Sequence, residues 1–431
     1  MVVVFRRGSR IRGRHITGAG AGLSGLTAAA RLAEAGHGVT VFEERETVGG
    51  RVRSTRADGY TFDRGYQVLF TGYPAVQREL DVDALDVGSF VPGATLSRDN
   101  HRSTLADPLR APSTLVDSAL NRDVRFRDKL NTLRLQRALA RDDYADLLDR
   151  DDQTIAEYLR EFGFSDAYIE RFVAPFYGGI TLDRSLQTAT NVFQYTYKAL
   201  SDGKVGLPAD GMGAIPEQLA ARAREAGARI ELGRGVEAVQ ADDSGATVTV
   251  GSETVDSDGV VVATDPHAAG DLTGVSTPDG AKSCVTQHFT FPAHRKLRTG
   301  RRIILNMADG QPNTVSPTTD AQPAYTPDDT QLFVANFIGE RDESDEELAT
   351  QVREAMASWY PETRFDEFEL RHTDRVKFAQ FPQPPGYRAG LPAPDSPDGN
   401  VVLAGDYTRW CSIQGSLESG RVAADLAVGF A

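Results

Sequence analysis

The chain has 431 residues, of which 40% are hydrophobic and 25% are charged, and its formal charge is −14 at neutral pH. This length exceeds what one hydrophobic core fills and predicts two or three globular domains, which excludes a fibrous or a disordered protein. The acidic balance argues against nucleic acid or anionic lipid as the main partner, and a total of two cysteines excludes a disulfide framework or a cysteine-rich metal site.

The first residues of the chain differ in character from the rest. An apolar run, residues 1–5, precedes several arginines, and this order is the reverse of that in a secretory signal. We therefore expect residues 1–14 to be a poorly defined basic extension. The sequence has no run of about 18 apolar residues that would span a bilayer. It thus predicts a soluble, cytoplasmic protein and leaves peripheral contact with a membrane open.

The next segment has the pattern of a strand, a helix and a second strand, at residues 15–19, 23–35 and 39–43. The first strand holds Thr17 and Gly18, whereas a buried parallel strand is typically a run of valine and isoleucine. The order of elements nevertheless predicts the start of a dinucleotide-binding α/β domain.

A glycine-rich turn joins the first strand to the helix. Gly20, Gly22 and Gly25 allow a tight turn, close approach of the backbone to a pyrophosphate, and close packing of the helix, whose N-terminus attracts phosphate. Glu43 ends the second strand, where a carboxylate accepts hydrogen bonds from both ribose hydroxyls. An acid at this place disfavours a 2′-phosphate and hence NADP. NAD and FAD both fit the pattern.

The continuation separates these two cofactors. It runs from Glu43 through Arg45 to Gly49, Gly50 and Arg51, and with this string the chain resembles the flavin-containing amine oxidase superfamily. That superfamily includes monoamine and polyamine oxidases, protoporphyrinogen oxidase and the phytoene desaturases. The resemblance implies non-covalent FAD, with both arginines facing its phosphates, which suit their forked donors, and with the glycine pair passing close to the flavin.

The likeness extends along nearly the whole chain, at residues 62–67, 207–213, 235–239, 405–406 and 412–420. The resemblance implies that the first of these strings contributes Gly65, Tyr66 and Gln67 to the cofactor site, and that the backbone of Val236 pairs with adenine. It also implies that Gly405 and Asp406 meet the ribityl or pyrophosphate part.

The last string begins a helix at Gln414 and Gly415, whose amides the resemblance directs at the flavin pyrimidine. A helix N-terminus carries partial positive charge and would favour the reduced flavin. The alternative is that this helix only docks onto the domain through Leu417, Val422 and Leu426, and both statements can hold at once.

Other segments predict the domain organisation. Helices are expected at 127–149, 153–162, 165–177 and 344–359, and strands at 229–240, 245–250, 259–264, 283–292, 331–338 and 401–405. The predicted fold is α/β, with a Rossmann-like FAD-binding domain and an interleaved α+β substrate domain. The FAD-binding domain is expected at 15–75, 205–275 and 395–431, and the substrate domain at 76–204, largely helical, and at 276–394, a sheet with helices.

Candidates for the substrate site are few. Nine aromatic residues lie between Phe162 and Tyr197, and they either line an apolar pocket or form the core of a helical region. Tyr177, beside two glycines, is the candidate for a pocket residue. Lys282 is either the water-linked lysine that some members of the superfamily place near the flavin or a surface lysine. The histidines show no metal-binding spacing, so no metal is expected.

These residues together predict an FAD-dependent oxidase or desaturase that removes a hydride from a small, apolar or amine substrate and forms a double bond. The flavin itself supplies the chemistry. Two alternatives stay open, a non-enzymatic binding protein similar to the GDP-dissociation inhibitors and an NAD-dependent dehydrogenase. An intact Gly-Gly-Arg string argues against both.

Overall fold

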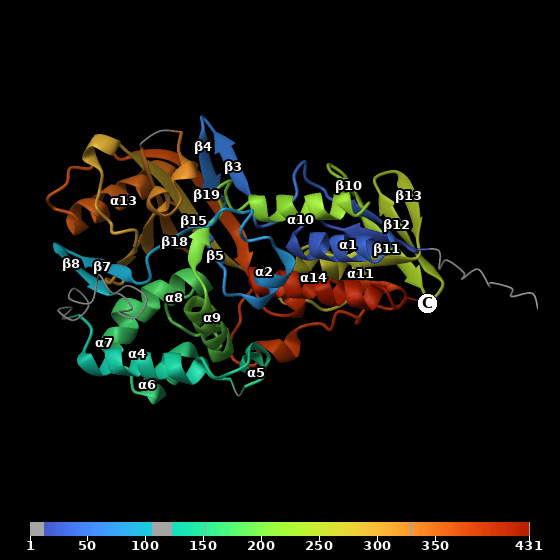
Figure 1. Ribbon diagram of the computed structural model, residues 1–431, viewed down its shortest axis with the longest axis horizontal. Coiled ribbons are helices and arrows are strands. Elements are labelled where there is room, and N and C mark those ends of the chain that lie inside the picture. Colours follow the sequence, from blue (N-terminus) through green and yellow to red (C-terminus); the bar gives the residue numbers. More distant parts are fainter. Residues whose placement is uncertain (1–12, 106–122, 151, 328–329, 431) are drawn as a thin grey trace, which may run out of the picture.

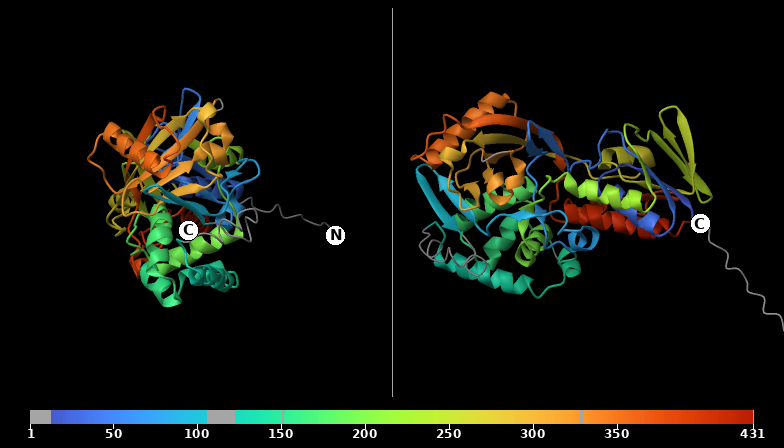
Figure 2. Two further views of the ribbon diagram at one scale, coloured as in Figure 1. Left: turned by 90° about the vertical axis from the view of Figure 1, so that its left-hand side faces the viewer. Right: turned by 45° about the horizontal axis from the view of Figure 1, so that its top comes forward.

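The structure is a computed structural model that describes residues 13–105, 123–150, 152–327 and 330–430. The extension expected at residues 1–14 therefore lies almost wholly outside the described residues. The molecule is elongated, with a parallel sheet and its helices at one end and a larger sheet at the other (Figure 1 and Figure 2).

A five-stranded parallel sheet forms the first end, in the order β10-β2-β1-β14-β20. Its strands are Arg229–Glu231, Gly38–Phe42, His15–Ala19, Gly259–Val262 and Val401–Leu403. Helix α1 (Leu23–Glu34) packs between α10 (Ala214–Glu225) and α14 (Ile413–Ala427). Three distant stretches of sequence thus build one sheet, which confirms the predicted α/β fold.

The weakly apolar strand β1 lies in the middle of this sheet. Gly18 fits there because its neighbour Val41 fills the space, and a Cβ at Gly18 would lie 3.1 Å from Val41 Cγ2. Ile16 and Thr17 are fully buried. The strand is therefore buried because of its neighbouring strands. Its residue composition alone would predict less burial.

A seven-stranded sheet forms the second end, in the order β19-β15-β18-β17-β16-β7-β8. Its strands are Glu369–Gln380, Lys282–Phe291, Gln331–Ile338, Thr314–Pro317, Ile303–Asn306, Ala94–Arg98 and His101–Leu105. Helix α13 (Asp345–Trp359) buries Leu348, Val352 and Met356 against one face of it. A capping box of Ser344 and Glu347 is present at the start of α13.

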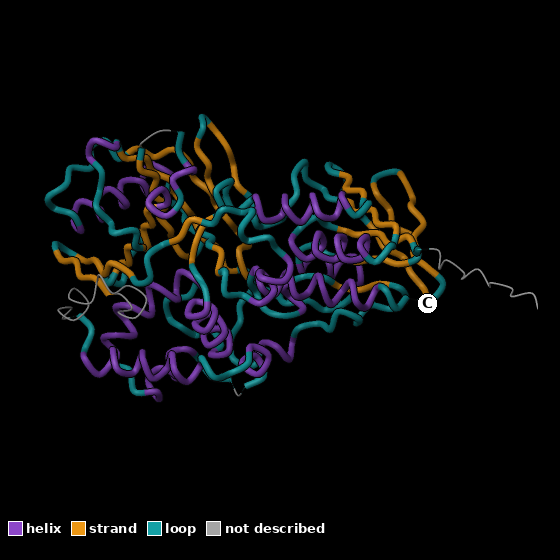
Figure 3. The backbone as a smooth tube through the Cα atoms, viewed as in Figure 1, coloured by secondary structure: helices purple, strands orange, loops and turns teal. Residues whose placement is uncertain are grey.

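Helices gather on the other side of this sheet (Figure 3). They are α4 (Phe126–Leu139), α5 (Tyr144–Leu148), α6 (Ile155–Phe162), α7 (Asp166–Tyr168), a π-helical turn at Ile169–Val173, α8 (Ala174–Thr181) and α9 (Thr190–Asp202). The single helix expected at 127–149 is wrong, because a turn at residues 140–143, three of them charged, separates two helices there.

Shorter strands complete the fold. They are β3 (Ser54–Ala57) with β4 (Tyr60–Asp63); β5 (Leu69–Phe70), β9 (Val205–Leu207) and β6 (Gly88–Ser89); and β11 (Ala238–Asp242), β12 (Gly245–Val250) and β13 (Glu253–Ser257). Short helices are α2 (Pro74–Glu79), α11 (Pro266–Thr273) and α12 (Thr318–Ala321). The one strand expected at 229–240 is wrong, because Gly233, at φ +68°, turns the chain between β10 and β11, which belong to different sheets.

The predicted domain borders stay a prediction. Strands β7 and β8 lie in the segment expected to be largely helical, yet they join the large sheet through β16. Strand β9 pairs with β5 of the same expected domain and with β6, which was expected in the substrate domain. In the described part of the chain, no helix is both long and apolar enough to cross a membrane.

Candidate functional site

The glycine-rich turn lies between β1 and α1 at the carboxyl edge of the parallel sheet. Gly20 has φ +102°, and a Cβ there would lie 2.7 Å from the Ala263 carbonyl oxygen. A Cβ at Gly25 would lie 2.1 Å from the carbonyl oxygen of Gly20. Gly22 differs, because a Cβ there would meet nothing within 4 Å. Gly20 and Gly25 are therefore required for close packing, whereas Gly22 borders open space.

Among the described residues, no side chain caps the N-terminus of α1. Gly22 is its N-cap and offers no side chain, and the first turn contains no acidic residue. Its amides therefore point, with the positive end of the helix dipole, at the space beside Gly22. This is the arrangement that binds a diphosphate.

Glu43 lies just past β2 with its carboxylate directed at this turn. One oxygen accepts a hydrogen bond from the Ala21 amide at 2.8 Å, and the other accepts from the Arg45 amide at 3.1 Å. The residue is only 4% exposed. A carboxylate has lone pairs left for further donors after two such bonds. The predicted ribose ligand thus sits next to the predicted diphosphate turn.

The Gly-Gly-Arg segment runs against the same turn. The Gly49 amide donates to the Ala21 carbonyl at 2.8 Å, and a parallel bridge pairs Gly22 with Gly49. Gly49 and Gly50 have φ values of +115° and +60°, a region that favours glycine. The glycine pair is therefore needed for the chain to pass over the turn.

The two arginines of this segment differ in their partners. Arg51 forms an ion pair with Asp406 at 2.6 Å and donates to the Ala379 carbonyl at 3.1 Å. Arg45, 44% exposed, pairs with Glu44 at 3.1 Å. Arg51 therefore joins residues at opposite ends of the chain, whereas Arg45 lies at the surface beside Glu43.

Asp406 also receives a hydrogen bond from the Cys411 thiol at 3.0 Å. Burial, together with the negative charge of Asp406, raises the pKa of Cys411 well above its usual value. Gly405 precedes this group, and its amide donates to the Ser419 hydroxyl at 2.8 Å. A thiol held protonated in this way is a poor nucleophile.

The loop with Gly65, Tyr66 and Gln67 connects this edge to the large sheet. The Gln67 side-chain amide donates to the carbonyl oxygens of Arg51 and Arg64, both at 3.0 Å. The Tyr66 hydroxyl accepts a hydrogen bond from Ser316 at 2.8 Å. The loop is thereby fixed to the Gly-Gly-Arg segment on one side and to β17 on the other.

Val236 lies on the segment between β10 and β11, near Glu43. The preceding Arg234 amide donates to the Glu43 carbonyl at 2.8 Å, which aligns the two segments. Within the described part of the chain, neither backbone polar group of Val236 bonds to another protein atom. Both groups are therefore free to pair with a ligand.

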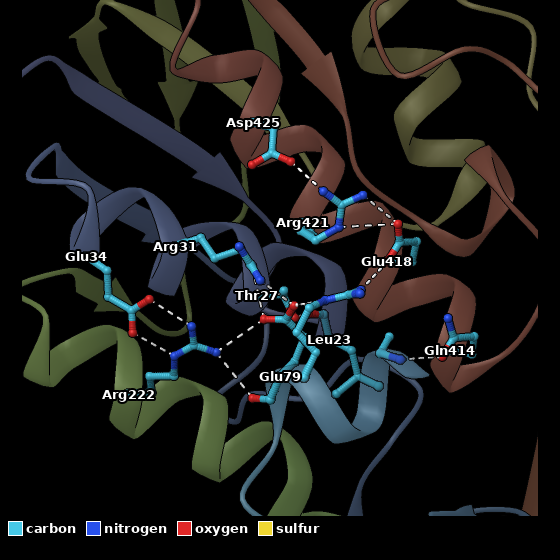
Figure 4. Close-up of polar contacts among 12 residues, drawn as sticks. Leu23, Thr27, Arg31, Glu34, Glu79, Arg222, Gln414, Glu418, Arg421 and Asp425 are labelled. Carbon is cyan, nitrogen blue, oxygen red and sulfur yellow. Dashed lines mark hydrogen bonds and ion pairs between the residues drawn. The ribbon is translucent and has the colours of Figure 1, made fainter. Parts of the chain in front are cut away.

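Helix α14 begins at the same end of the molecule. Its N-cap Ser412 accepts a hydrogen bond from the Gly415 amide at 2.8 Å, and a Cβ at Gly415 would lie 2.0 Å from the Trp410 carbonyl oxygen. The Gln414 side chain accepts from the Ala75 amide at 2.8 Å and so caps α2 (Figure 4). The Gln414 side chain therefore has a structural role, and only its backbone is left for the predicted flavin contact.

Lys282 and Tyr177 have different surroundings from those expected of a surface lysine and a pocket residue. Lys282 is 19% exposed in its side chain, lies 3.6 Å from Asp183 and donates to the Thr181 carbonyl at 3.0 Å. Burial lowers its pKa. Tyr177 is 3% exposed and packs against Phe193 with ring centroids 4.6 Å apart. The aromatic set thus forms a packed helical core.

Sequence reasoning missed a buried polar cluster next to the Gly65 loop. Asp63 accepts hydrogen bonds from Ser54 and Tyr325, both at 2.6 Å, and burial raises its pKa. Its carbonyl lies 3.2 Å from His288 Nε2, and burial lowers the pKa of His288 to about 4. Asp63 stands inside the string that carries the resemblance, but no pattern in the sequence marks His288 or Tyr325.

A narrow cavity of about 10 Å³ lies between this cluster and the loop, enough for about one water molecule. Its lining includes Asp63, Gly65, Tyr66, Gln67, His288 and Tyr325. Among the described residues, no group of three or more His, Cys, Asp or Glu side chains is placed to hold a metal ion.

One curated relative of this chain is a desaturase. The chain is 52% identical to a 4,4′-diapophytoene desaturase (4,4′-diaponeurosporene-forming) of Staphylococcus haemolyticus over 62 residues. These residues are 14% of this chain and 12% of the relative. The chain thus matches only a small part of the curated relative's length.

Two solved structures share the fold. An oxidoreductase from Methanosarcina mazei has a TM-score of 0.72 at 17% identity, over 95% of this chain and 100% of that one. Cyclohexylamine oxidase from Brevibacterium oxydans has a TM-score of 0.65 at 17% identity, over 97% and 99%.

The family model of the flavin containing amine oxidoreductases matches residues 23–428. The match begins at the N-terminus of α1 and ends in α14, so it includes nearly every predicted cofactor residue. The family uses FAD, and the non-enzymatic and NAD-dependent alternatives receive no support. The chain belongs to the flavin containing amine oxidoreductase family.

Proposed function

We propose that the protein is an FAD-dependent oxidase or desaturase that removes a hydride from a small organic substrate, apolar or an amine, and leaves a double bond in it, with a proton lost to solvent or to a neighbouring group. The observation that carries this proposal is the uncapped N-terminus of α1, open beside Gly22, with the buried carboxylate of Glu43 at its turn. When bound, FAD supplies the acceptor for the hydride.

The adenine half of the cofactor has a set of matching partners. The amides of the α1 N-terminus would bind the diphosphate, Glu43 the ribose hydroxyls, and the free backbone groups of Val236 the adenine edge. Arg45, with its guanidinium at the surface beside Glu43, would add positive charge near the phosphates. Gly49 and Gly50 keep this approach free of side chains.

The flavin half is proposed to lie toward α14 and the Gly65 loop. Arg51, already paired with Asp406, would hold the ribityl and phosphate region, and Gly405 precedes this pair in the chain. Ser412 engages the Gly415 amide, whereas the amides of Ile413 and Gln414 stay available at the start of the helix. A helix N-terminus here stabilises negative charge on the pyrimidine edge.

The substrates named for two similar proteins support an apolar or amine substrate for this chain. One relative is a desaturase of diapophytoene and one solved neighbour is an oxidase of cyclohexylamine. For this chain we propose an apolar or amine substrate that binds beside the Gly65 loop, near Tyr66 and His288. No side chain with strong base character is needed where the proton that accompanies the hydride passes to solvent.

The test uses the full chain, stripped of flavin and titrated with FAD. Glu43→Gln removes the negative charge at the ribose site, and we expect the FAD affinity to fall at least tenfold. Glu44→Gln is the matched control, because the neighbouring Glu44 side chain is 66% exposed. Equal FAD affinity in the two variants, or a purified protein that binds NAD and no flavin, would contradict the proposal.

A further inference from the structure

The two faces of the large sheet differ in chemistry. On β15, Val285, Phe289 and Phe291 point into the apolar core under α13. The alternate residues Thr286 and His288 point to the opposite face, because successive side chains of a strand alternate. One face is therefore a conventional core, and the other carries polar side chains in a buried place.

The strand register places these polar residues side by side. Thr286 pairs with Asn336 of β18, and Asn336 pairs with Thr314 of β17. Paired residues of antiparallel strands present their side chains on the same face. Thr286, Asn336 and Thr314 therefore form one row, and His288 stands in the next row. We call these four residues the polar strip.

Every member of the polar strip has an unused polar atom. In the described part of the chain, the hydroxyls of Thr286 and Thr314, both polar atoms of the Asn336 carboxamide, and His288 Nδ1 make no hydrogen bond. The four residues are 0%, 2%, 1% and 1% exposed. Buried polar atoms in native proteins are nearly always paired with protein or ordered water, so an unpaired group of this size indicates water or a ligand as its partner.

The strip lies next to the proposed flavin position. A Cβ at Gly65 would lie 3.6 Å from Val376 Cγ2 and 4.0 Å from Cys284 Sγ, so the Gly65 loop lies over this face of the sheet. From the helical side, a Cβ at Gly179 of α8 would lie 3.8 Å from Thr314 Cγ2. The strip is thus enclosed between α8 and the loop, and His288 lines the cavity described above.

We infer that the polar strip is the substrate-recognition subsite and that it hydrogen-bonds a neutral hydroxyl or carboxamide group of the substrate. This inference rests on the proposed function and narrows its substrate class: the substrate carries a polar substituent and is not a pure hydrocarbon. A group that both donates and accepts matches the Asn336 carboxamide, which offers one of each.

The charged groups beside the strip disfavour an anion. His288 Nε2 lies 3.2 Å from the Asp63 carbonyl, so Nε2 carries the proton and Nδ1 is an acceptor. Asp374 pairs with Thr286 at the β19 end of the row, and it repels a carboxylate. Its neighbour His372 lies 3.2 Å from it and 5.8 Å, between ring centroids, from His288. A neutral donor is therefore favoured over an anion.

The experiment uses three probes of similar shape with the FAD-loaded full chain. Benzamide offers a donor and an acceptor, α-methylstyrene offers neither, and benzoate is an anion. We expect benzamide to bind at least tenfold more tightly than either of the others, measured by calorimetry. Equal binding of benzamide and α-methylstyrene, or no benzamide binding, would overturn the inference, and the FAD content of the same sample tests the proposed function separately.

Variants locate the effect. Asn336→Leu and Thr286→Val replace unpaired polar groups by apolar ones of similar shape, so each should keep or raise the Tm and reduce benzamide affinity at least fivefold. Thr290→Val is the control on the same strand and face, because its hydroxyl already accepts from Arg371 at 2.9 Å. It should lower the Tm and leave the benzamide affinity within twofold. A lower Tm in both test variants with unchanged benzamide affinity means that internal water satisfies the strip, and it overturns the inference.

Discussion

At the scale of single residues, Gly22 and Gly25 belong to one motif, but a larger side chain would be excluded for different reasons at the two positions. Gly22 has φ −74°, an ordinary value, and its Cβ direction is open. We expect Gly22→Ala to change the stability of the flavin-free chain by less than about 0.5 kcal/mol and to weaken FAD binding at least tenfold, because the methyl group would occupy the phosphate approach. Thermal melting and FAD titration measure the two effects.

Gly25→Ala is expected to destabilise the folded chain, because the added methyl group would clash with protein atoms. Its Cβ would lie 2.1 Å from Gly20 O and 3.0 Å from Ala263 Cβ, so α1 must move away from the sheet. We expect a loss of about 3 kcal/mol of stability with or without FAD. If Gly25→Ala left the stability unchanged and Gly22→Ala lowered it, the roles assigned to the two glycines, packing for Gly25 and cofactor approach for Gly22, would be reversed.

The two thiols of the chain are predicted to be inert in the folded protein. Burial raises the pKa of Cys284 to about 11, and burial beside Asp406 raises the pKa of Cys411 further. Since the thiolate is the reactive form, an aromatic disulfide reagent at pH 8 should modify neither cysteine within minutes in the native state and both in denaturant. Rapid modification of one native thiol would show that its surroundings are more open than described.

At the scale of elements, the cap of α13 offers a simple test. Ser344 accepts from the Glu347 amide at 3.3 Å, and Glu347 accepts from the Ser344 amide at 2.8 Å. Ser344→Ala should therefore lower stability by about 1 kcal/mol in thermal melts. Thr350→Ala, an exposed position in the same helix, is the control and should be neutral or slightly stabilising, because alanine has the higher helix propensity. Equal effects of the two changes would speak against the cap.

Elements with a local signal were predictable from sequence, and those defined by distant partners were not. Strand β18 and the start of α13 agree with the sequence prediction, because alternation and a capping box are encoded within a few residues. Strand β19 was missed, since it lies at the edge of the sheet and reads as a charged segment. Strand β7 depends on parallel pairing with β16, about which neighbouring residues carry no information.

The same division applies to the candidate site. The glycine turn and Glu43 were predicted, because a fixed spacing within one βαβ unit encodes them. The ion pair of Arg51 with Asp406 and the contacts of Asp63 with Tyr325 join distant segments, so only the folded chain reveals them. The polar strip depends on strand register, which single-strand patterns do not specify.

At the scale of the whole molecule, one buried carboxylate connects three helices. The Glu79 side chain is 0% exposed and pairs with Arg31 of α1 at 2.7 Å and with Arg222 of α10 at 3.3 Å (Figure 4). Glu79→Gln should lower stability by about 2 kcal/mol, because it removes the charged partner of Arg31 and leaves Arg222 with Glu34 alone. Glu34→Gln, whose side chain is 44% exposed, is the control and should cost less than about 1 kcal/mol.

The pH dependence of this network has a definite sign. Burial alone would raise the pKa of Glu79, but hydrogen bonds from Arg31 and Arg78 outweigh it and lower the pKa. A group with a lowered pKa in the folded state stabilises above its unfolded pKa, which is about 4.3 for glutamate, and loses that contribution as the pH falls through the folded value. The difference in Tm between the parent and Glu79→Gln should thus be full at pH 7 and shrink below about pH 4. A difference that is constant over this range would show that the charge of Glu79 is not responsible.

The order of strands in the parallel sheet has a consequence for how the chain matures during translation. Strands β1 and β2 leave the ribosome early, but β14, which pairs with β1, follows only at residues 259–262 and β20 at residues 401–403. One edge of β1 therefore stays unpaired while most of the polypeptide is still being made, and an unpaired edge invites association with other chains. Strand β20 pairs with β14 at the edge of this sheet, so a message cut short before codon 401 would yield a chain in which β14 is the unpaired edge.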